Sequence, residues 1–487
     1  MNPFLNPRNT IPFLKNFLLY PGRIERLSPD QLKRYQDKAL RNVLSFASQV
    51  PVYQKKYAEA GIDPHDIKGI QDITKLPLIS RQDFRDHFPE GIVPRGYHKE
   101  KGFVVCTGGT TGKYCCNSGS QPICIYTDIP TMLPAIGISV REQRAFHINW
   151  RTARIAHLGN FNPFKVDEIY EKNIQNHLKT FFSFKNYLSM NASDPINDIV
   201  KRLEEFKPDV IISYPAIFQE LAYLKTKGHG QHIRPKMLNV GGEMLDAYTK
   251  WYVETAFGCN MYNVYASCEA GANIAFECTE RNWHVHSDFF HIEAVDENNE
   301  PVSPGERGRI VLTRLWNGAT PIIRYTGMDD WVTLSSGRTC GCGLHSPIFE
   351  KPVEGRIKFN IVLPNGTVYP PSTFLFITSV LIDYKTFKVR RYQIIQKALN
   401  DIEILLVIDN DLRHQGPPVE QIMNGIKKVY EEKVGPEVNI TVRETDAIPD
   451  DPTSGKPPPL FVSYLSTGDA CTRGSCINEK RFDVKDD

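Results

Sequence analysis

Residues 106–116 read CTGGTTGKYCC, and this stretch narrows the choice of fold more than any other. Its glycines let backbone N–H groups approach a ligand closely, and its threonines and Lys113 add hydroxyl donors and a positive charge, which together suit a phosphate group. The Walker loop G-x-x-x-x-G-K-S/T does not fit, because Thr107 stands at its first glycine and Tyr114 follows the lysine. The stretch alone therefore leaves two interpretations, a phosphate-binding loop of another kind and a plain surface turn.

The composition is that of a globular chain. Of its 487 residues, 41% are apolar, which is enough for two to four structural units with sizeable cores. The 58 basic and 56 acidic residues leave a formal charge of +2, without a run of like charges that could hold a nucleic acid. The apolar stretch IPFLKNFLLY (11–20) is short and contains Lys15, which favours neither a signal peptide nor a membrane span. We expect a cytoplasmic protein that binds neither nucleic acid nor membrane.

The periodicity of apolar residues predicts an α/β chain with two domains. Residues 28–47 repeat apolar side chains at helical spacing, and the helix should end before Pro51. From there to about residue 350, strand-like runs such as DVIIS and RIVLTRL alternate with helical stretches, as in a layered α/β domain. The following order of strand, strand, helix and strand is typical of a small α+β domain. The expected divisions are a large domain at 1–354, a small domain at 355–465 and a loosely held tail at 466–487.

The eleven cysteines favour a metal site and free thiols over a disulfide framework, because they are odd in number and scattered over a long chain. Cys340 and Cys342 form a tight C-x-C turn in TCGCGLH. Together with Cys278 and one histidine they would supply three sulfurs and one imidazole, a closed ligand set that structural zinc accepts. The spacing lacks the regularity of zinc fingers, so the sequence spacing alone leaves this site open.

Four stretches, taken in order, resemble motifs of the adenylate-forming superfamily, which includes acyl-CoA ligases, luciferases and peptide-synthetase adenylation domains. They are the loop TGGTTGK (107–113), VGGEML (240–245), VYASCEAG (264–271) and PIIRYTGMDD (321–330). The run at 50–91 is similar to the opening of the phenylacetate-CoA ligase branch, which also contains capsule-biosynthesis and coenzyme-adenylating synthetases. The resemblance covers residues 28–460 and implies a large, multi-layer N-terminal AMP-binding domain with a small, mobile α+β lid domain.

The resemblance also implies how ATP would be bound. The residues implied to cradle the phosphates are Thr107, Gly108, Gly109, Thr110, Thr111 and Gly112, with Lys113 adding positive charge. Those implied to border adenine are Gly241, Gly242, Glu243 and Tyr265. Glu269 matches the carboxylate that holds magnesium, and Asp329 matches the one that accepts hydrogen bonds from both ribose hydroxyls. Asp330 is an alternative to Asp329, because TGMDD contains one residue more than the family's T-G-D.

Two further stretches resemble the family's C-terminal motifs. PTSGKPPPL (452–460) is similar to the terminal G-K segment, which makes Lys456 the residue that bridges the substrate carboxylate and the α-phosphate. GRIKFNIVLPNGTVYP (355–370) resembles the hinge about which the small domain rotates, and its Arg356 would contact ribose or phosphate. The expected catalytic residues are therefore Thr111, Lys113, Glu269 and Lys456.

By this resemblance the chain is an ATP- and Mg²⁺-dependent ligase. It would join a carboxylic acid to AMP, release pyrophosphate and pass the acyl group to a thiol, for which coenzyme A is the expected acceptor. One alternative is transfer to a carrier-protein thiol or an amine. Another is a nucleotide-binding homologue without turnover, suggested by Cys268 and Tyr114, which depart from the family's motifs. A homodimer is among the expected assemblies.

Members of the phenylacetate-CoA ligase branch also bind structural zinc through a similar C…H…C-x-C set. This resemblance favours His284 over His286 and His345 as the imidazole. The implied ligands of a structural Zn²⁺ are therefore Cys278, His284, Cys340 and Cys342.

Overall fold

The computed structural model describes Ile11 and residues 27–106, 123–163, 165–179, 183–328, 330–335, 340–354, 360–448 and 460–465 of the chain. Its contacts divide the chain into two compact units. The first unit comprises residues 1–243 and 257–353, and the second comprises residues 244–256 and 354–487. A helical segment from the middle of the sequence thus groups with the C-terminal residues. The predicted domain boundaries stay predictions, and the predicted tail lies outside the described residues.

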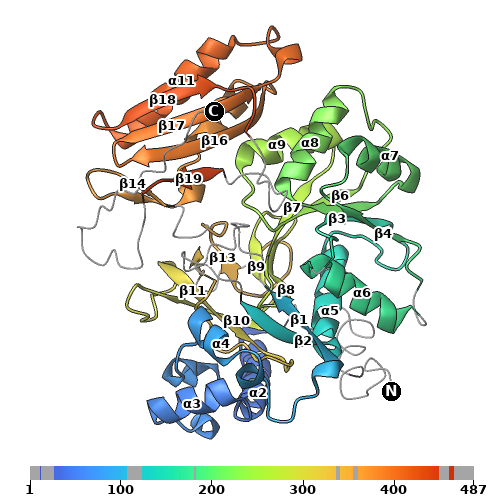
Figure 1. Ribbon diagram of the computed structural model, residues 1–487, viewed down its shortest axis with the longest axis vertical. Helices are drawn as coiled ribbons and strands as arrows, with labels where there is room; N and C mark the ends of the chain where they lie inside the picture. Colours follow the sequence, from blue (N-terminus) through green and yellow to red (C-terminus); the bar gives the residue numbers. More distant parts are fainter. Residues whose placement is uncertain are drawn as a thin grey trace, which may run out of the picture. The chain divides into compact units, whose positions relative to one another are not determined.

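An eight-stranded sheet of the first unit has the strand order β13-β9-β8-β7-β6-β5-β3-β4 (Figure 1). Its parallel strands are β3 (Ile155–Gly159), β4 (Tyr187–Asn191), β5 (Val210–Ser213), β6 (Met237–Val240) and β7 (Met261–Ser267). Its antiparallel strands are β8 (Ala272–Glu277), β9 (Trp283–Val285) and β13 (Ile348–Phe349). β5 confirms the strand predicted from DVIIS.

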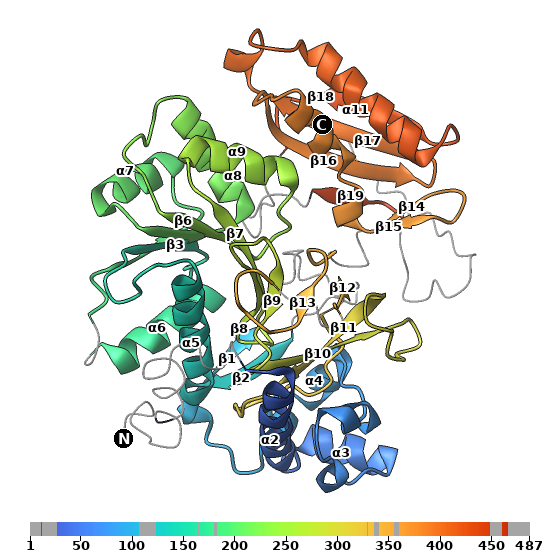
Figure 2. The same ribbon diagram turned by 180° about the vertical axis from the view of Figure 1, so that it is seen from behind.

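Helices connect the parallel strands, as the alternating sequence pattern predicts. They are α6 (Val166–Leu178), α7 (Ile196–Phe206), α8 (Pro215–Thr226) and α9 (Ala247–Phe257). Figure 2 shows α6, α7 and α8 beside the sheet, and α7 buries Ile199, Val200 and Leu203. Because the strands are parallel, their carboxyl ends meet at one edge, the place where open α/β sheets bind ligands. Tyr214 and Gly241 follow β5 and β6 at this edge.

The N-terminal part of the first unit is helical. Its helices are α2 (Pro29–Ala47), α3 (Pro51–Ala60) and α4 (Arg81–His87), with 3₁₀ turns at Pro64–Asp66, Ile70–Lys75, Glu90–Ile92 and Lys99–Lys101. α2 confirms the predicted amphipathic helix. The Ser28 hydroxyl accepts a hydrogen bond from the Gln31 backbone N–H (3.3 Å), and the Gln31 side chain accepts one from the Ser28 N–H (3.1 Å), so both N-terminal donors are satisfied. Pro51 begins the next helix, where its missing N–H costs no hydrogen bond.

Two smaller sheets also belong to the described part of the first unit. β1 (Gly102–Cys106) pairs antiparallel with β2 (Cys124–Asp128), which leads into α5 (Ile129–Ala145). β10 (Phe290–Val295), β11 (Arg307–Arg314) and β12 (Trp331–Thr333) form an antiparallel sheet. β11 confirms the strand predicted from RIVLTRL. Apolar side chains from α2, α3, β2 and β11 share one buried core, which holds the N-terminal helices against these sheets.

The second unit contains a four-stranded sheet in the order β18-β17-β16-β19. Its elements are β14 (Ile361–Val362), β15 (Val368–Tyr369), α10 (Phe376–Asp383), β16 (Val389–Ala398), β17 (Asp401–Ile408), α11 (Val419–Val434), β18 (Asn439–Glu444) and β19 (Phe461–Ser463), with 3₁₀ turns at Pro371–Thr373 and Asn410–Leu412. This order confirms the predicted α+β pattern. The buried Tyr248 of α9 donates a hydrogen bond to the carbonyl of Val389 (3.0 Å), and the ring of Trp251 stacks on Phe387 at 4.7 Å. These contacts explain why most of α9 groups with the C-terminal residues.

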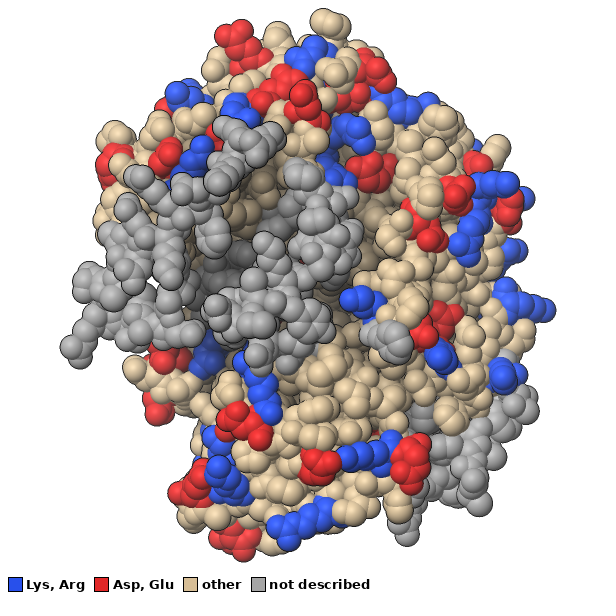
Figure 3. All heavy atoms as spheres, viewed as in Figure 1, with Lys and Arg blue, Asp and Glu red and all other residues tan. Residues whose placement is uncertain are grey.

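The surface carries charges of both signs. On the face drawn in Figure 3, acidic and basic side chains are interspersed over the described residues, in keeping with the net charge of +2. Among the described residues, no helix combines the length and hydropathy needed to cross a membrane.

Candidate functional site

The structure describes five of the residues predicted to bind ATP. They are Gly241, Gly242, Glu243, Tyr265 and Glu269. The others lie outside the described residues: Thr107, Gly108, Gly109, Thr110, Thr111, Gly112, Lys113, Asp329, Arg356 and Lys456.

The glycine pair after β6 is packed too closely for larger residues. A Cβ atom at Gly241 would lie 2.7 Å from the Cγ2 atom of Val264. At Gly242, φ is +79°, and a Cβ atom would lie 3.0 Å from the ring of Tyr214. The Tyr214 hydroxyl in turn donates a hydrogen bond to Asp167 (3.2 Å). Backbone and aromatic ring therefore meet at the carboxyl edge of the sheet, where the adenine contact is predicted.

The Glu269 carboxylate is buried and fixed by a tyrosine that sequence reasoning missed. Glu269 lies in the turn between β7 and β8, and its side chain Oε1 accepts a hydrogen bond from the Tyr325 hydroxyl at 3.0 Å. Tyr325 is fully buried, and its ring stacks on Phe84 with centroids 5.4 Å apart. Burial, and then the nearby Glu269 charge, raise the pKa of Tyr325, so it remains a donor at neutral pH. The sequence signal that could have identified Tyr325 is its position in PIIRYTGMDD, a stretch that resembles a family motif.

A second hydrogen bond joins the stretches VYASCEAG and PIIRYTGMDD. The Tyr265 hydroxyl of β7 donates a hydrogen bond to Oδ2 of Asp330 at 2.7 Å. The residue predicted to pack on adenine thus lies beside the alternative candidate for the ribose contact. The choice between Asp329 and Asp330 stays a prediction, because Asp329 lies outside the described residues.

Arg324 anchors the PIIRYTGMDD segment. Its Nε and Nη2 atoms donate to the two carboxylate oxygens of Glu293 at 3.1 and 2.9 Å, and its Nη1 atom donates to the carbonyls of Thr74 and Leu76. Its φ of +46° lies in the left-handed region, which is unfavourable for a side chain of this kind. These hydrogen bonds hold the segment beside β10 and the N-terminal helices.

The four predicted metal ligands lie together. The ligand atoms of Cys278, His284, Cys340 and Cys342 are all within 4.8 Å of one another. The Cys278 and Cys340 sulfurs are 3.6 Å apart, and the Cys342 sulfur is 3.3 Å from Nε2 of His284. Tetrahedral zinc with Zn–S bonds of about 2.3 Å would separate two sulfurs by about 3.8 Å, so the set fits zinc.

The protonation of this cluster also suits a cation. Burial lowers the pKa of His284 to about 4, which leaves its imidazole neutral, and Nδ1 contacts the Ser346 hydroxyl at 3.0 Å. Burial raises the pKa of Cys342 to about 12, so a cation is needed to hold this thiol as a thiolate at neutral pH. His286, the alternative imidazole, makes a different set of contacts.

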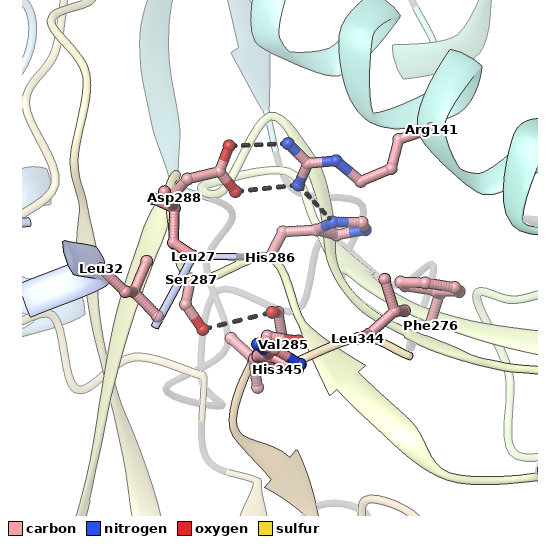
Figure 4. A pocket seen from close by; sticks show the side chains of 11 residues that line it. Leu27, Leu32, Arg141, Phe276, Val285, His286, Ser287, Asp288, Leu344 and His345 are labelled. Carbon is pink, nitrogen blue, oxygen red and sulfur yellow. Dashed lines mark hydrogen bonds and ion pairs between the residues drawn. The ribbon is translucent and has the colours of Figure 1, made fainter. Parts of the chain in front are cut away.

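A buried polar network surrounds His286 beside a small pocket (Figure 4). Arg141 of α5 donates to both oxygens of Asp288 at 2.8 and 2.7 Å and to Nδ1 of His286 at 3.1 Å. Because Arg141 is always a donor, Nε2 of His286 carries the ring proton and donates to Glu142 at 3.0 Å. Asn273 donates to both oxygens of the same carboxylate. The network joins α5 to the segment that follows His284.

Glu142 gives this network a dependence on pH. Burial raises its pKa from 4.5 to about 8, so the folded state binds more protons than the unfolded state between these values. The contribution of Glu142 to stability is therefore complete below about pH 4.5 and is lost as the pH rises through about 8. We expect Glu142→Gln to flatten the decline of the unfolding free energy over this window, measured by urea denaturation. The exposed Glu280→Gln is the control, and an unchanged slope for Glu142→Gln would contradict the assignment.

The expectation of free thiols is wrong for two cysteines. Cys106 and Cys124 form a disulfide bond, whereas free thiols were expected. The reason is that they stand opposite each other at the ends of β1 and β2, with Cα atoms 4.0 Å apart. Among the described residues, the cysteines that form no disulfide bond are Cys259, Cys268, Cys278, Cys340 and Cys342.

Comparisons with known proteins agree with these motifs. No protein-family model matches the chain. A phenylacetate-coenzyme A ligase of Thermus thermophilus is 25% identical over 403 residues, which cover 80% of this chain and 84% of that protein. A phenylacetate-coenzyme A ligase of Pseudomonas putida is 26% identical over 315 residues, which cover 63% of this chain and 67% of that protein.

Solved structures share the fold. A 2-hydroxyisobutyryl-CoA ligase in complex with R3-HIB-AMP has a TM-score of 0.72 at 18% identity, covering 87% of this chain and 88% of that chain. The anthranilate CoA ligase AuaEII in complex with anthranoyl-AMP has a TM-score of 0.50 at 12% identity, covering 92% and 95%. The chain is therefore similar in sequence to phenylacetate-coenzyme A ligases, at 25% and 26% identity, and shares its fold with solved CoA ligases.

Proposed function

We propose that the chain is an AMP-forming acid–thiol ligase, which activates a carboxylic acid as an acyl-adenylate and transfers the acyl group to coenzyme A. The observation that carries this proposal is the contact of Tyr325 with Glu269, which joins two distant motifs around one buried carboxylate. The relatives named phenylacetate-coenzyme A ligase support the reaction class. Activation through AMP is chemically reasonable, because AMP is a far better leaving group than a carboxylate oxygen.

The proposed roles follow the motifs. ATP and Mg²⁺, when bound, supply a pyrophosphate leaving group and the positive charge that stabilises it. Glu269 holds the magnesium, Tyr265 packs on adenine, and Lys456 contacts the substrate carboxylate. The residues proposed to hold the phosphates are Thr107, Gly108, Gly109, Thr110, Thr111, Gly112 and Lys113; those proposed for adenine, ribose and the adjoining phosphate are Gly241, Gly242, Glu243, Asp329 and Arg356.

The test is product analysis with ATP, Mg²⁺, coenzyme A and a panel of acids that begins with phenylacetate. We expect AMP and an acyl-CoA thioester by mass spectrometry, and an acyl-adenylate when coenzyme A is left out. An adenylate without a thioester would favour a carrier-protein thiol or an amine as acceptor. ATP binding without pyrophosphate release would favour a homologue without turnover. The homodimer stays a prediction, which size-exclusion chromatography can test.

We also propose that Cys278, His284, Cys340 and Cys342 hold a structural zinc ion. The close approach of three sulfurs and one imidazole supports this, and a set of four protein ligands leaves no position for a reacting water.

Removal of one ligand should remove the metal. We expect Cys342→Ser to lower zinc from about one ion per chain to near zero and to lower the melting temperature, because structural zinc contributes folding free energy. Elemental analysis and thermal unfolding measure both effects. Cys259→Ser is the matched control, because Cys259 forms no disulfide bond and lies outside the set of four ligands. Wild-type protein without zinc after gentle purification would contradict the proposal.

A further inference from the structure

The ring of Tyr214 supports the backbone of the segment VGGEML (240–245). Gly241, which follows the last residue of β6, donates its N–H to the carbonyl of Ser213 (3.3 Å). At the next residue, Gly242, φ is +79° and a Cβ atom would point at the Tyr214 ring. Apart from the chain neighbours of Gly242, the only atoms of described residues within 4 Å of that position are Cε1 and Cδ1 of this ring, at 3.0 and 3.1 Å. On this side the segment therefore rests on Tyr214 alone among the described residues.

The Tyr214 hydroxyl is in turn held by Asp167 of α6. It donates a hydrogen bond to Oδ2 of Asp167 at 3.2 Å, and the same oxygen accepts one from the Asn160 N–H at 2.7 Å. A Cβ atom at Gly159, the last residue of β3, would lie 2.7 Å from this oxygen, so the end of β3 fixes the carboxylate independently of the tyrosine. Burial, and then the Asp167 charge, raise the pKa of Tyr214, so its hydroxyl remains a donor at neutral pH.

We propose that Asp167 and Tyr214 are positioning residues for ATP: Asp167 fixes the Tyr214 hydroxyl, the Tyr214 ring fixes the backbone at Gly242, and the affinity for the adenine base depends on both contacts. The inference rests on the ligase function proposed above, in which Gly241, Gly242 and Glu243 border adenine. A backbone segment that is already ordered loses less entropy when it binds a ligand. The contacts should therefore strengthen ATP binding without changing the rate of the chemical step.

Three substitutions separate the hydroxyl, the acceptor and the charge. Tyr214→Phe removes the hydroxyl and keeps the ring, and Asp167→Leu removes the acceptor. Asp167→Asn removes the charge but keeps one oxygen, which can accept both hydrogen bonds because both go to Oδ2. Tyr187→Phe is the matched control, since it removes another half-buried hydroxyl, which contacts Nδ1 of His157 at 2.8 Å.

The first measurement is calorimetric titration of the full chain with ATP and, separately, with GTP. We expect Tyr214→Phe and Asp167→Leu to raise the dissociation constant for ATP by about threefold to tenfold, at most the scale of one hydrogen bond to a charged group. The preference for ATP over GTP should fall by the same factor, because the two nucleotides carry the same phosphates. Asp167→Asn and Tyr187→Phe should bind ATP as wild type does.

The second measurement is ATP–pyrophosphate exchange. The KM for ATP should rise by the same factor in Tyr214→Phe and Asp167→Leu, while kcat and the KM for the acid stay at their wild-type values, because only binding of the nucleotide is weakened. A purely structural role of these residues would lower the melting temperature without producing this split.

Wild-type ATP affinity in a folded Tyr214→Phe protein would overturn the inference and leave the ligase function intact. A rise in the KM for the acid with an unchanged KM for ATP would also overturn it, because the tyrosine would then act on the acyl group. If Asp167→Leu does not fold, Tyr214→Phe still tests the same hydrogen bond. A wild-type chain that binds no ATP would overturn the ligase function as well.

Discussion

Replacing Glu269 with glutamine is expected to lower acid-dependent ATP–pyrophosphate exchange by about a hundredfold, the scale measured for the loss of one preorganised electrostatic group. The side chain is only 5% exposed and is held by the Tyr325 hydroxyl, so glutamine would occupy nearly the same space. It would lack the negative charge that a magnesium ligand supplies. The concentration of Mg²⁺ needed for half-maximal exchange should rise.

Tyr325→Phe is the matched control for this experiment. It keeps the carboxylate and removes the hydrogen bond that Tyr325 donates to Oε1, so we expect a smaller loss of about tenfold, the scale of one hydrogen bond to a charged group. Thermal unfolding should show that both variants remain folded. Exchange within threefold of wild type in a folded Glu269→Gln protein would remove Glu269 from the mechanism.

Replacing Arg324 with methionine is expected to lower the free energy of unfolding by about 3–5 kcal/mol, because it leaves a buried carboxylate without its partner. Glu293 is 8% exposed, and Arg324 supplies both hydrogen bonds that join the pair. Burial raises the pKa of Glu293, and the Arg324 charge opposes this effect, so the lost partner would also favour protonation of the carboxyl group. The free energy of unfolding obtained from urea denaturation measures the change.

The double variant Arg324→Met/Glu293→Leu shows how much of the lost stability comes from the unpaired carboxylate of Glu293. Replacing both members of a buried ion pair with apolar side chains is often close to neutral, so much of the lost stability should return. A single variant that loses less than about 1 kcal/mol, the range typical of exposed pairs, would show that the pair does not anchor the segment.

Local signals in the sequence predict much of the fold. Ser28 followed by Pro29 marks the start of α2 because the hydroxyl caps the first N–H groups, and this depends on neighbouring residues alone. The alternation of strands and helices likewise predicts the parallel sheet. The grouping of most of α9 with the second unit was not predictable in this way. It rests on contacts such as Trp251 with Phe387, which are far apart in the sequence.

The candidate site shows the same limit. Motif resemblance selects Glu269 and Tyr265, but it does not reveal that Tyr325 and Asp330 are their hydrogen-bond partners, since these residues lie 56 and 65 positions away in the sequence. The Cys106–Cys124 bond escaped prediction for a related reason. The sequence separates these cysteines by 18 residues, and only the pairing of β1 with β2 brings them together.

Acid-dependent ATP–pyrophosphate exchange tests the central claim most directly, because it reports formation of the acyl-adenylate without the acyl acceptor. Labelled pyrophosphate, ATP and Mg²⁺ are incubated with the full chain and single acids from a panel that starts with phenylacetate. The proposed function predicts that at least one acid stimulates incorporation of label into ATP, that coenzyme A is not required, and that Glu269→Gln abolishes most of the signal. Folded protein that binds ATP and shows no exchange with any acid of the panel would contradict it.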